Sequence, residues 1–456
     1  MSRNNRKSSY GALVIVVLIV AAALFVMKAP MFESNAPEIG INSNGYWNLK
    51  DPLEVSINDE SGVKSYKVKL ATSKGVVELN HEQFMAPQMG VKFAVKLPST
   101  AYNMEDKSIT LVVEALDASK WNFLNGNATT SEFVIKVDKR KPLINILANS
   151  YKISKGGSAL VVFKAVDENM KELYIEVGDK KFLAQPFYKE GYFISLIAWS
   201  MLHADFKATL VGVDHAGNST QVYVPLYLLT KEYKVSNMKL DDRFLQGKIA
   251  ELASEFEETQ GVEDSIEQFK IINEKIRAKN ERLIHSITSK VPTQMISNFT
   301  MNPMYPLRNG QVVAQFGDYR KYSYNDKEVS ESYHMGLDLA SNSMADIIPK
   351  NGGEVVYADY TGLYGNMPII HHGLGLYTLY GHCSSVNVTA GTIVDASANT
   401  VIANTGKSGY AMGDHLHFGV LVQGVEVRPQ EWMDSEWIKL NITDIIQSSK
   451  AIIDKI

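Results

Sequence analysis

Cysteine is almost absent from this chain of 456 residues, which contains only Cys383. A single cysteine excludes a disulfide within the chain and a structural zinc site built from several thiolates. Cys383 directly follows His382. We expect Cys383 to be a small buried residue, and catalysis by its thiol is the less favoured alternative.

An excess of basic residues is also absent. The chain has 46 lysines and arginines against 50 aspartates and glutamates, which gives a net charge of -4. No long basic block stands out, so we expect no nucleic acid among the partners.

One long apolar run lies near the N-terminus. Residues 11–27, GALVIVVLIVAAALFVM, contain no charged residue and no proline. Basic residues precede this run, which predicts a transmembrane anchor at 11–27 with residues 1–10 in the cytoplasm. A cleaved signal peptide is the alternative. Either reading puts everything after residue 30 outside the cytoplasmic membrane.

Two regions carry the alternation of strands. Residues 34–138 contain SYKVKLAT, SITLVVEALD and SEFVIKVD, and residues 139–229 repeat this character, with TLVGVD echoing LVVEALD. Short strands at regular spacing predict two immunoglobulin-like β-sandwiches joined near DKRKP at 138–142. We expect both sandwiches to act as spacers.

The rest of the chain divides into three parts. Residues 239–290 have helical periodicity, with Asp241 or Asp242 available as a cap, and predict a helical arm. Strand signals return over residues 304–433, and residues 434–456 predict a helical tail. The expected fold class is therefore mainly β and multidomain.

Histidines gather in the last β region. In GDHLHFGV, His415 and His417 would share one face of a strand, because side chains two residues apart point the same way. Alternation in SYHMGLDLA likewise puts His334 and Asp338 on one face, and YTLYGHCSS puts His382 on a strand face.

Two imidazoles and one carboxylate form a ligand set that suits zinc, with a fourth position left for water. Zinc lowers the pKa of water and polarises a carbonyl, and hydrolysis also needs a nearby base. More histidines are present than the metal requires. One member of the 415/417 pair would bind the metal, and its neighbour would serve the water.

The motifs HMGLD, LYGH and GDHLHF, in this order, resemble those of the lysostaphin-like (LytM-type) zinc endopeptidases of peptidoglycan. FGDYR upstream and RPQEW downstream strengthen the resemblance, which covers residues 304–433. It implies one zinc ion bound by His334, Asp338 and His417. It also implies that His415 is the general base and that His382 orients the water or stabilises the intermediate.

The resemblance further implies a small antiparallel β domain in which a zinc-activated water cuts peptide bonds of peptidoglycan stems or cross-links. The expected location is a bacterial inner membrane, crossed once, with the catalytic domain in the periplasm or outside. The partners would be peptidoglycan and the membrane.

Four residues are candidates for contacts with substrate, namely Tyr319, Arg320, Tyr377 and Tyr380. His372 could face the rim of the groove. Two other classes of function stay open: a non-enzymatic module of the kind formed by relatives that have lost their ligands and activate amidases, and an adhesion protein. The retained histidines disfavour the former and are unexplained by the latter. A regulatory helical arm that covers the groove is a further hypothesis.

Overall fold

The computed structural model describes residues 5–98 and 103–455. The few remaining positions of the predicted cytoplasmic segment, first sandwich and tail lie outside the described residues. The chain separates into two compact units. The first comprises residues 1–142, 167–171 and 213–219, and the second comprises the remainder.

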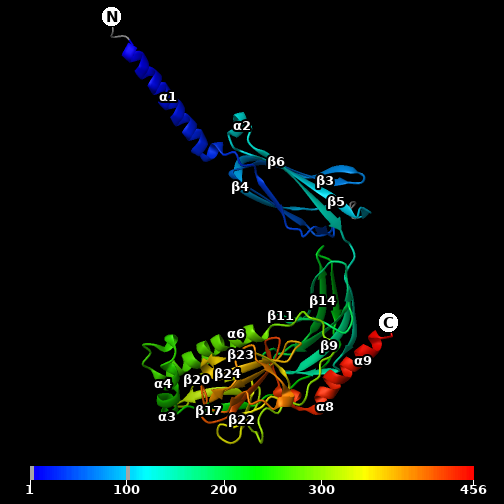
Figure 1. Cartoon of the computed structure of the whole chain (residues 1–456), viewed down its shortest axis with the longest axis vertical. Coiled ribbons are helices and arrows are strands. Elements are labelled where there is room, and N and C mark those ends of the chain that lie inside the picture. Colours follow the sequence, from blue (N-terminus) through cyan, green and yellow to red (C-terminus); the bar gives the residue numbers. More distant parts are fainter. Residues whose placement is uncertain (1–4, 99–102, 456) are drawn as a thin grey trace. The chain divides into compact units, whose positions relative to one another are not determined.

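The N-terminal helix α1 spans Asn5–Lys28 (Figure 1). Its 24 residues correspond to about 36 Å of helix, and the stretch Gly11–Lys28 is long and apolar enough to cross a membrane. This length and composition are typical of membrane anchors and of signal sequences alike.

The first unit is built on a six-stranded sheet with the order β1-β3-β5-β6-β2, in which β4 also pairs with β3. Alternation along β5 turns Ile109, Leu111 and Val113 into the core, as the sequence predicts. The strands are hydrogen-bonded into one sheet, so an immunoglobulin-like sandwich remains a prediction for this region. Its strands and short helices are β1 Glu38–Ile41, β2 Tyr46–Trp47, β3 Leu53–Thr72, β4 Gly75–Val95, β5 Ser108–Asp117, β6 Ala128–Val137, η1 Pro30–Phe32 and α2 Trp121–Leu124.

The next β region forms two four-stranded sheets, β11-β10-β14-β15 and β12-β13-β9-β7, and a parallel pair of β8 with β16. The central strand β9 is buried along nearly its whole length. The strands are β7 Leu143–Asn149, β8 Lys152–Ser154, β9 Ser158–Val166, β10 Met170–Val177, β11 Lys180–Leu183, β12 Gln185–Pro186, β13 Tyr192–Ala198, β14 Ala208–Asp214, β15 Ser219–Tyr223 and β16 Tyr227–Leu229.

Within the second unit, this β region packs directly on the C-terminal domain. The side-chain amide of Gln423 donates to the carbonyls of Leu183 and Leu196, and the Leu183 N–H donates back to Gln423 Oε1. Phe187 forms a β-bridge with Ile296. Apart from residues 167–171 and 213–219, the region therefore belongs to the same compact unit as the C-terminal domain.

The region predicted as a helical arm is helical. Its elements are α3 Asp242–Phe244, η3 Leu245–Ile249, α4 Ala250–Ala253, η4 Glu257–Thr259, α5 Ser265–Lys270, η5 Ile271–Ile276 and α6 Arg277–Thr288. Asp241 caps α3 by accepting the Phe244 N–H, and Asp264 caps α5. Both π-helical stretches, η3 and η5, continue directly from an α-helix.

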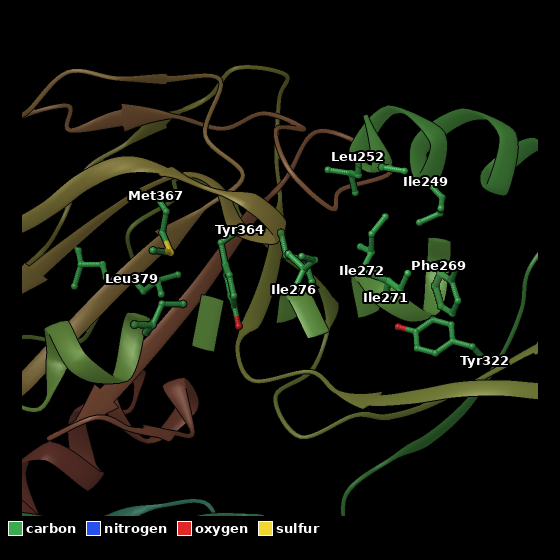
Figure 2. Close-up of a cluster of buried hydrophobic side chains, with 14 of the residues drawn as sticks. Ile249, Leu252, Phe269, Ile271, Ile272, Ile276, Tyr322, Tyr364, Met367 and Leu379 are labelled. Carbon is green, nitrogen blue, oxygen red and sulfur yellow. The ribbon is translucent and has the colours of Figure 1, made fainter. Parts of the chain in front are cut away.

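The helices pack against the C-terminal domain. Figure 2 shows the buried cluster in which Ile249, Phe269 and Ile272 share a core with Tyr364 and Met367. Burial of each large aliphatic side chain contributes about 1.5–3 kcal/mol, so a cluster of this size fixes the helices to the domain. The helices therefore form a structural layer of the second unit.

The C-terminal domain is centred on an eight-stranded sheet with the order β18-β21-β29-β25-β24-β23-β27, with β30 beside β29. Two three-stranded sheets, β17-β19-β20 and β22-β28-β26, complete it. The strands are β17 Val235–Lys239, β18 Gln311–Ala314, β19 Tyr319–Tyr324, β20 Lys327–Tyr333, β21 Leu337–Ala340, β22 Asp346–Ile347, β23 Gly353–Thr361, β24 Gly365–His371, β25 Leu376–Gly381, β26 Ser385–Val386, β27 Ile393–Val394, β28 Ala403–Asn404, β29 Leu416–Val422 and β30 Val425–Val427.

Helices end the chain and fill short connections. They are η6 Gly362–Tyr364, η7 Ala396–Ala398, α7 Pro429–Met433, α8 Ser435–Ile438, η8 Lys439–Thr443 and α9 Asp444–Ile453. The whole protein is mainly β with few helices, as the sequence predicts.

Candidate active site

Two side chains from one motif, His334 and Asp338, meet His417 from a distant strand in one buried group. His334 Nε2 lies 2.9 Å from Asp338 Oδ1 and 3.1 Å from His417 Nδ1, and His417 Nδ1 lies 2.9 Å from the same carboxylate oxygen. All three residues are less than a tenth exposed. The three ligand atoms are close enough together to bind a single metal ion.

The sheet places two of these residues. Asp338 on β21 lies directly opposite His417 on β29 in the antiparallel register. His334, in contrast, lies in the irregular link between β20 and β21, so the prediction of a continuous strand through His334, Gly336 and Asp338 is wrong. Polar and apolar residues go on alternating between the end of β20 and the start of β21. The sequence therefore gives no sign that the strand is interrupted there.

Gly336 explains why the link has its shape. A Cβ atom at this position would lie 2.5 Å from both Cε1 and Nε2 of His417. That distance is well inside van der Waals contact. Position 336, midway between His334 and Asp338, therefore has to lack a side chain.

The protonation states suit a metal. His334 Nδ1 lies 2.8 Å from the Gln315 carbonyl, and donation to it leaves the Nε2 lone pair free for a ligand. Burial lowers the pKa of His417 and keeps the ring neutral. Burial raises the pKa of Asp338, but the two histidines outweigh this effect and hold the pKa well below its usual range. The donor set is thus one carboxylate with two imidazoles, which fits zinc.

Two further histidines stand beside the group. His415 Nδ1 lies 2.8 Å from the Gly413 carbonyl and His382 Nδ1 lies 2.9 Å from the Ser408 carbonyl, which assigns the proton to Nδ1 in both rings. The rings of His382 and His415 are 4.9 Å apart, and His415 Nε2 is 3.8 Å from Asp338 Oδ2. Both rings therefore keep an Nε2 lone pair beside the group.

Neither of these histidines lies within a strand, contrary to the sequence prediction. His415 directly precedes β29, and His382 directly follows β25 with a φ of 63°. Positive φ is uncommon for a residue with a side chain and concentrates at functional sites. Burial, together with the nearby rings of His417 and His415, lowers the pKa of His382 to about 3, so this ring is neutral at physiological pH.

A groove of about 330 Å³ runs past all five residues. One wall comes from the segment that leads into the helices, where Met238, Leu240 and Phe244 line the groove. Arg277 on α6 also lines it. The sequence analysis did not identify these groove residues, because helical periodicity shows that one face is buried without showing which residues meet the histidines.

The remaining candidates divide clearly. Arg320 lines the groove, whereas Tyr377 and Tyr380 are buried among other partners. Tyr319 hydrogen-bonds Glu331. His372 bonds the Gly352 carbonyl and the Thr378 hydroxyl and does not line the groove.

Cys383 is fully buried, as expected. Burial raises the pKa of its thiol to about 12. A thiol with so high a pKa is uncharged at physiological pH, which disfavours Cys383 as a nucleophile.

Residues 332–429 match the family described as Peptidase family M23. The chain contains an M23 peptidase domain. The match includes all five histidine and aspartate residues of the group and its surroundings, and it lies within the predicted range 304–433. The helices and β17, which supply one wall of the groove, lie outside the matched residues.

Relatives of the M23 domain carry several names. The DD-carboxypeptidase/endopeptidase Mpg of Neisseria meningitidis is 28% identical over 118 residues, which cover 26% of this chain and 25% of that protein. The peptidoglycan DD-endopeptidase ShyB of Vibrio cholerae is 29% identical over 126 residues, which cover 28% of each. The murein hydrolase activator EnvC of Escherichia coli is 30% identical over 112 residues, covering 25% of this chain and 26% of that protein. The chain thus spans about a quarter of the length of these curated relatives.

Proposed function

We propose that the protein is a membrane-anchored zinc endopeptidase that hydrolyses peptide bonds in peptidoglycan stems or cross-links during remodelling of the cell wall. The convergence of His334 Nε2, Asp338 Oδ1 and His417 Nδ1 within 3.1 Å carries the proposal. Three protein ligands of these types are the set that catalytic zinc sites use, with the fourth position taken by water. The groove of about 330 Å³ beside them would receive the substrate peptide.

The ion, when bound, supplies a Lewis acid that acidifies water and polarises the scissile carbonyl. His415 accepts the proton of the attacking water at Nε2, and the Gly413 carbonyl steadies the resulting imidazolium through Nδ1–H. His382 stays neutral and orients the water through its own Nε2. Hydrolysis then ends with transfer of the proton from His415 to the departing amine.

The relatives support the substrate class. Two of the three are named as endopeptidases, one of them a peptidoglycan DD-endopeptidase, and the matched residues include the whole proposed site. Helix α1 would anchor the chain in the bacterial inner membrane, with the catalytic domain in the periplasm.

A non-enzymatic role is the second candidate, since the similar protein EnvC is named a murein hydrolase activator. In the first role the site itself hydrolyses peptidoglycan, whereas in the second role another enzyme does so. The presence of His334, Asp338, His417, His382 and His415 around one groove favours hydrolysis by this chain.

Digestion of purified peptidoglycan by the full chain in detergent tests the proposal. We expect soluble muropeptides, detected by mass spectrometry, whose release stops on chelation and resumes with zinc. His415→Ala should retain zinc and release fragments about 10²- to 10⁴-fold more slowly, as loss of a general base predicts. His81→Ala, an exposed control, should match the wild type. Equal rates for His415→Ala and the wild type would contradict the assignment of the base.

A further inference from the structure

One cation, Arg320, stands beside the metal-ligand group. Arg320 lines the groove from β19, its side chain is 20% exposed, and its Nη2 atom lies 3.9 Å from Asp338 Oδ2. Its guanidinium therefore lies next to the point where the scissile bond has to bind.

The orientation of Arg320 is fixed in advance. Its Nε donates to Asp318 Oδ2 at 3.4 Å, while Asp318 Oδ1 accepts the Ser236 hydroxyl at 2.7 Å. Ser236 on β17 is paired with Arg320 in the parallel register, and the Asp318 carbonyl accepts the His334 N–H. Asp318 thus holds both Arg320 and the backbone of His334, one of the proposed metal ligands.

Within the described part of the chain, the terminal nitrogens of Arg320 donate no hydrogen bond, since the bond to Asp318 uses Nε. A guanidinium binds a carboxylate best through two parallel hydrogen bonds, and a fixed guanidinium loses less freedom in doing so. Arg320 has the free donors and the fixed position that such a contact needs.

The charges of the groove favour an anion. Lys239 and Arg277 also line it, whereas Asp241 is the one groove carboxylate apart from Asp338 among the described residues. Since Asp338 belongs to the ligand group, cations outnumber anions on the walls. A glycine-rich cross-bridge of peptidoglycan is uncharged and would offer no anion to these cationic side chains.

We propose that Arg320 determines specificity by binding a carboxylate of the substrate close to the scissile bond. The inference rests on the proposed function and narrows its substrate to anionic stem peptides. The apolar wall of Met238, Leu240 and Phe244 would contact the methyl or methylene groups that accompany such a carboxylate.

Two groups in stem peptides offer this carboxylate. One is the α-carboxylate of a terminal D-alanine, and the other is the side-chain carboxylate of diaminopimelate. Both present the same planar anion to a guanidinium, so synthetic peptides that differ in one amide distinguish them.

The test uses the full chain in detergent with three cross-linked stem peptides: one with all carboxylates free, one amidated at diaminopimelate, and one amidated at the terminal D-alanine. We expect kcat/KM of the wild type to fall about 10- to 100-fold for one of the two amides, the loss that a charged hydrogen bond predicts. The amide that is poorly cleaved identifies which carboxylate Arg320 binds.

Arg320→Gln should cleave the acid and that amide at similar rates, mainly through a raised KM for the acid, with unchanged zinc content. Arg320→Lys should keep part of the preference. Lys321→Gln, the neighbour on β19 that pairs with Glu328, should keep all of it. Zinc content and melting temperature, measured for each variant, separate this role from a structural one.

The two proposals fail in different ways. An active wild type that cleaves all three peptides equally, or an Arg320→Gln variant that keeps the preference, would overturn the role of Arg320 alone. A zinc-loaded wild type that cleaves none of the peptides and no peptidoglycan would overturn the proposed function and the inference with it.

Discussion

Gly336 has no room for a side chain, and this single position links the backbone to the proposed metal site. Gly336→Ala would place a methyl group 2.5 Å from the His417 ring, which Asp338 and His334 hold in place. We expect zinc affinity to fall by about 10- to 100-fold, the range seen when a support of a ligand is lost. Metal content after dialysis, measured by mass spectrometry, checks this.

Gly413→Ala is the matched control, because a Cβ there would meet nothing within 4 Å although the residue lies two positions from His415. Its zinc content should equal that of the wild type. Equal metal binding by Gly336→Ala would show that the His417 ring moves freely.

At this scale the sequence predicts identities better than conformations. The motifs around His334, His382 and His417 name the residues that meet in one groove. Their strand assignments are wrong at His334 and His382, because alternation of polar and apolar residues continues where the strand has ended, and His415 forms only an isolated bridge with Gly406 before β29. The left-handed backbone of His382 carries no signal in its neighbours.

Among the elements, the helices over residues 242–288 illustrate what periodicity can and cannot predict. The pattern identifies a buried face and a cap at Asp241. It does not identify the β domain as the surface that covers this face, because an apolar stripe packs against any complementary one. The sequence therefore could not predict that Met238, Leu240 and Phe244 form a wall of the groove.

Ile272→Ala tests the attachment of the helices. Ile272 is fully buried in the cluster of Figure 2, so its truncation should cost about 2–5 kcal/mol of unfolding free energy and lower the melting temperature. Leu283→Ala, at a position on α6 that is 40% exposed, should change stability much less. Similar melting curves for both variants, recorded by circular dichroism, would mean that the helices are held loosely.

For the whole molecule, the prediction of spacers accounts for the strands of residues 139–229 and misses their packing on the C-terminal domain. The contacts involve isolated polar groups, such as Gln423 and Glu431, whose partners are more than 200 residues away in sequence. Patterns of local hydropathy cannot encode such pairs. Strand content is thus predictable here, whereas the grouping into compact units is not.

Glu431 makes this packing sensitive to pH. Burial raises the pKa of its carboxyl to about 7 from an ordinary 4.5, although Arg428 and the Ser158 N–H oppose the shift. The folded state therefore holds a proton that the unfolded chain releases. The contribution of this carboxyl to stability is greatest below pH 4.5 and falls as pH rises to about 7, by up to about 3 kcal/mol.

Glu431→Gln should remove this dependence. The melting temperature of the wild type should fall relative to that of the variant between pH 5 and pH 8, as followed by scanning calorimetry. Glu436→Gln, at an exposed neighbouring position, should follow the wild type. Parallel curves for wild type and Glu431→Gln would show that the carboxyl is ionised throughout.

The groove wall formed by Met238, Leu240 and Phe244 has a consequence for protein engineering. These residues precede the matched range 332–429. A graft of that range into another M23 protein would therefore transfer the proposed hydrolytic residues without this wall of the groove. Chimaeras cut before Val235 should inherit the substrate choice of this protein, and those cut at Ser332 should take on that of the host.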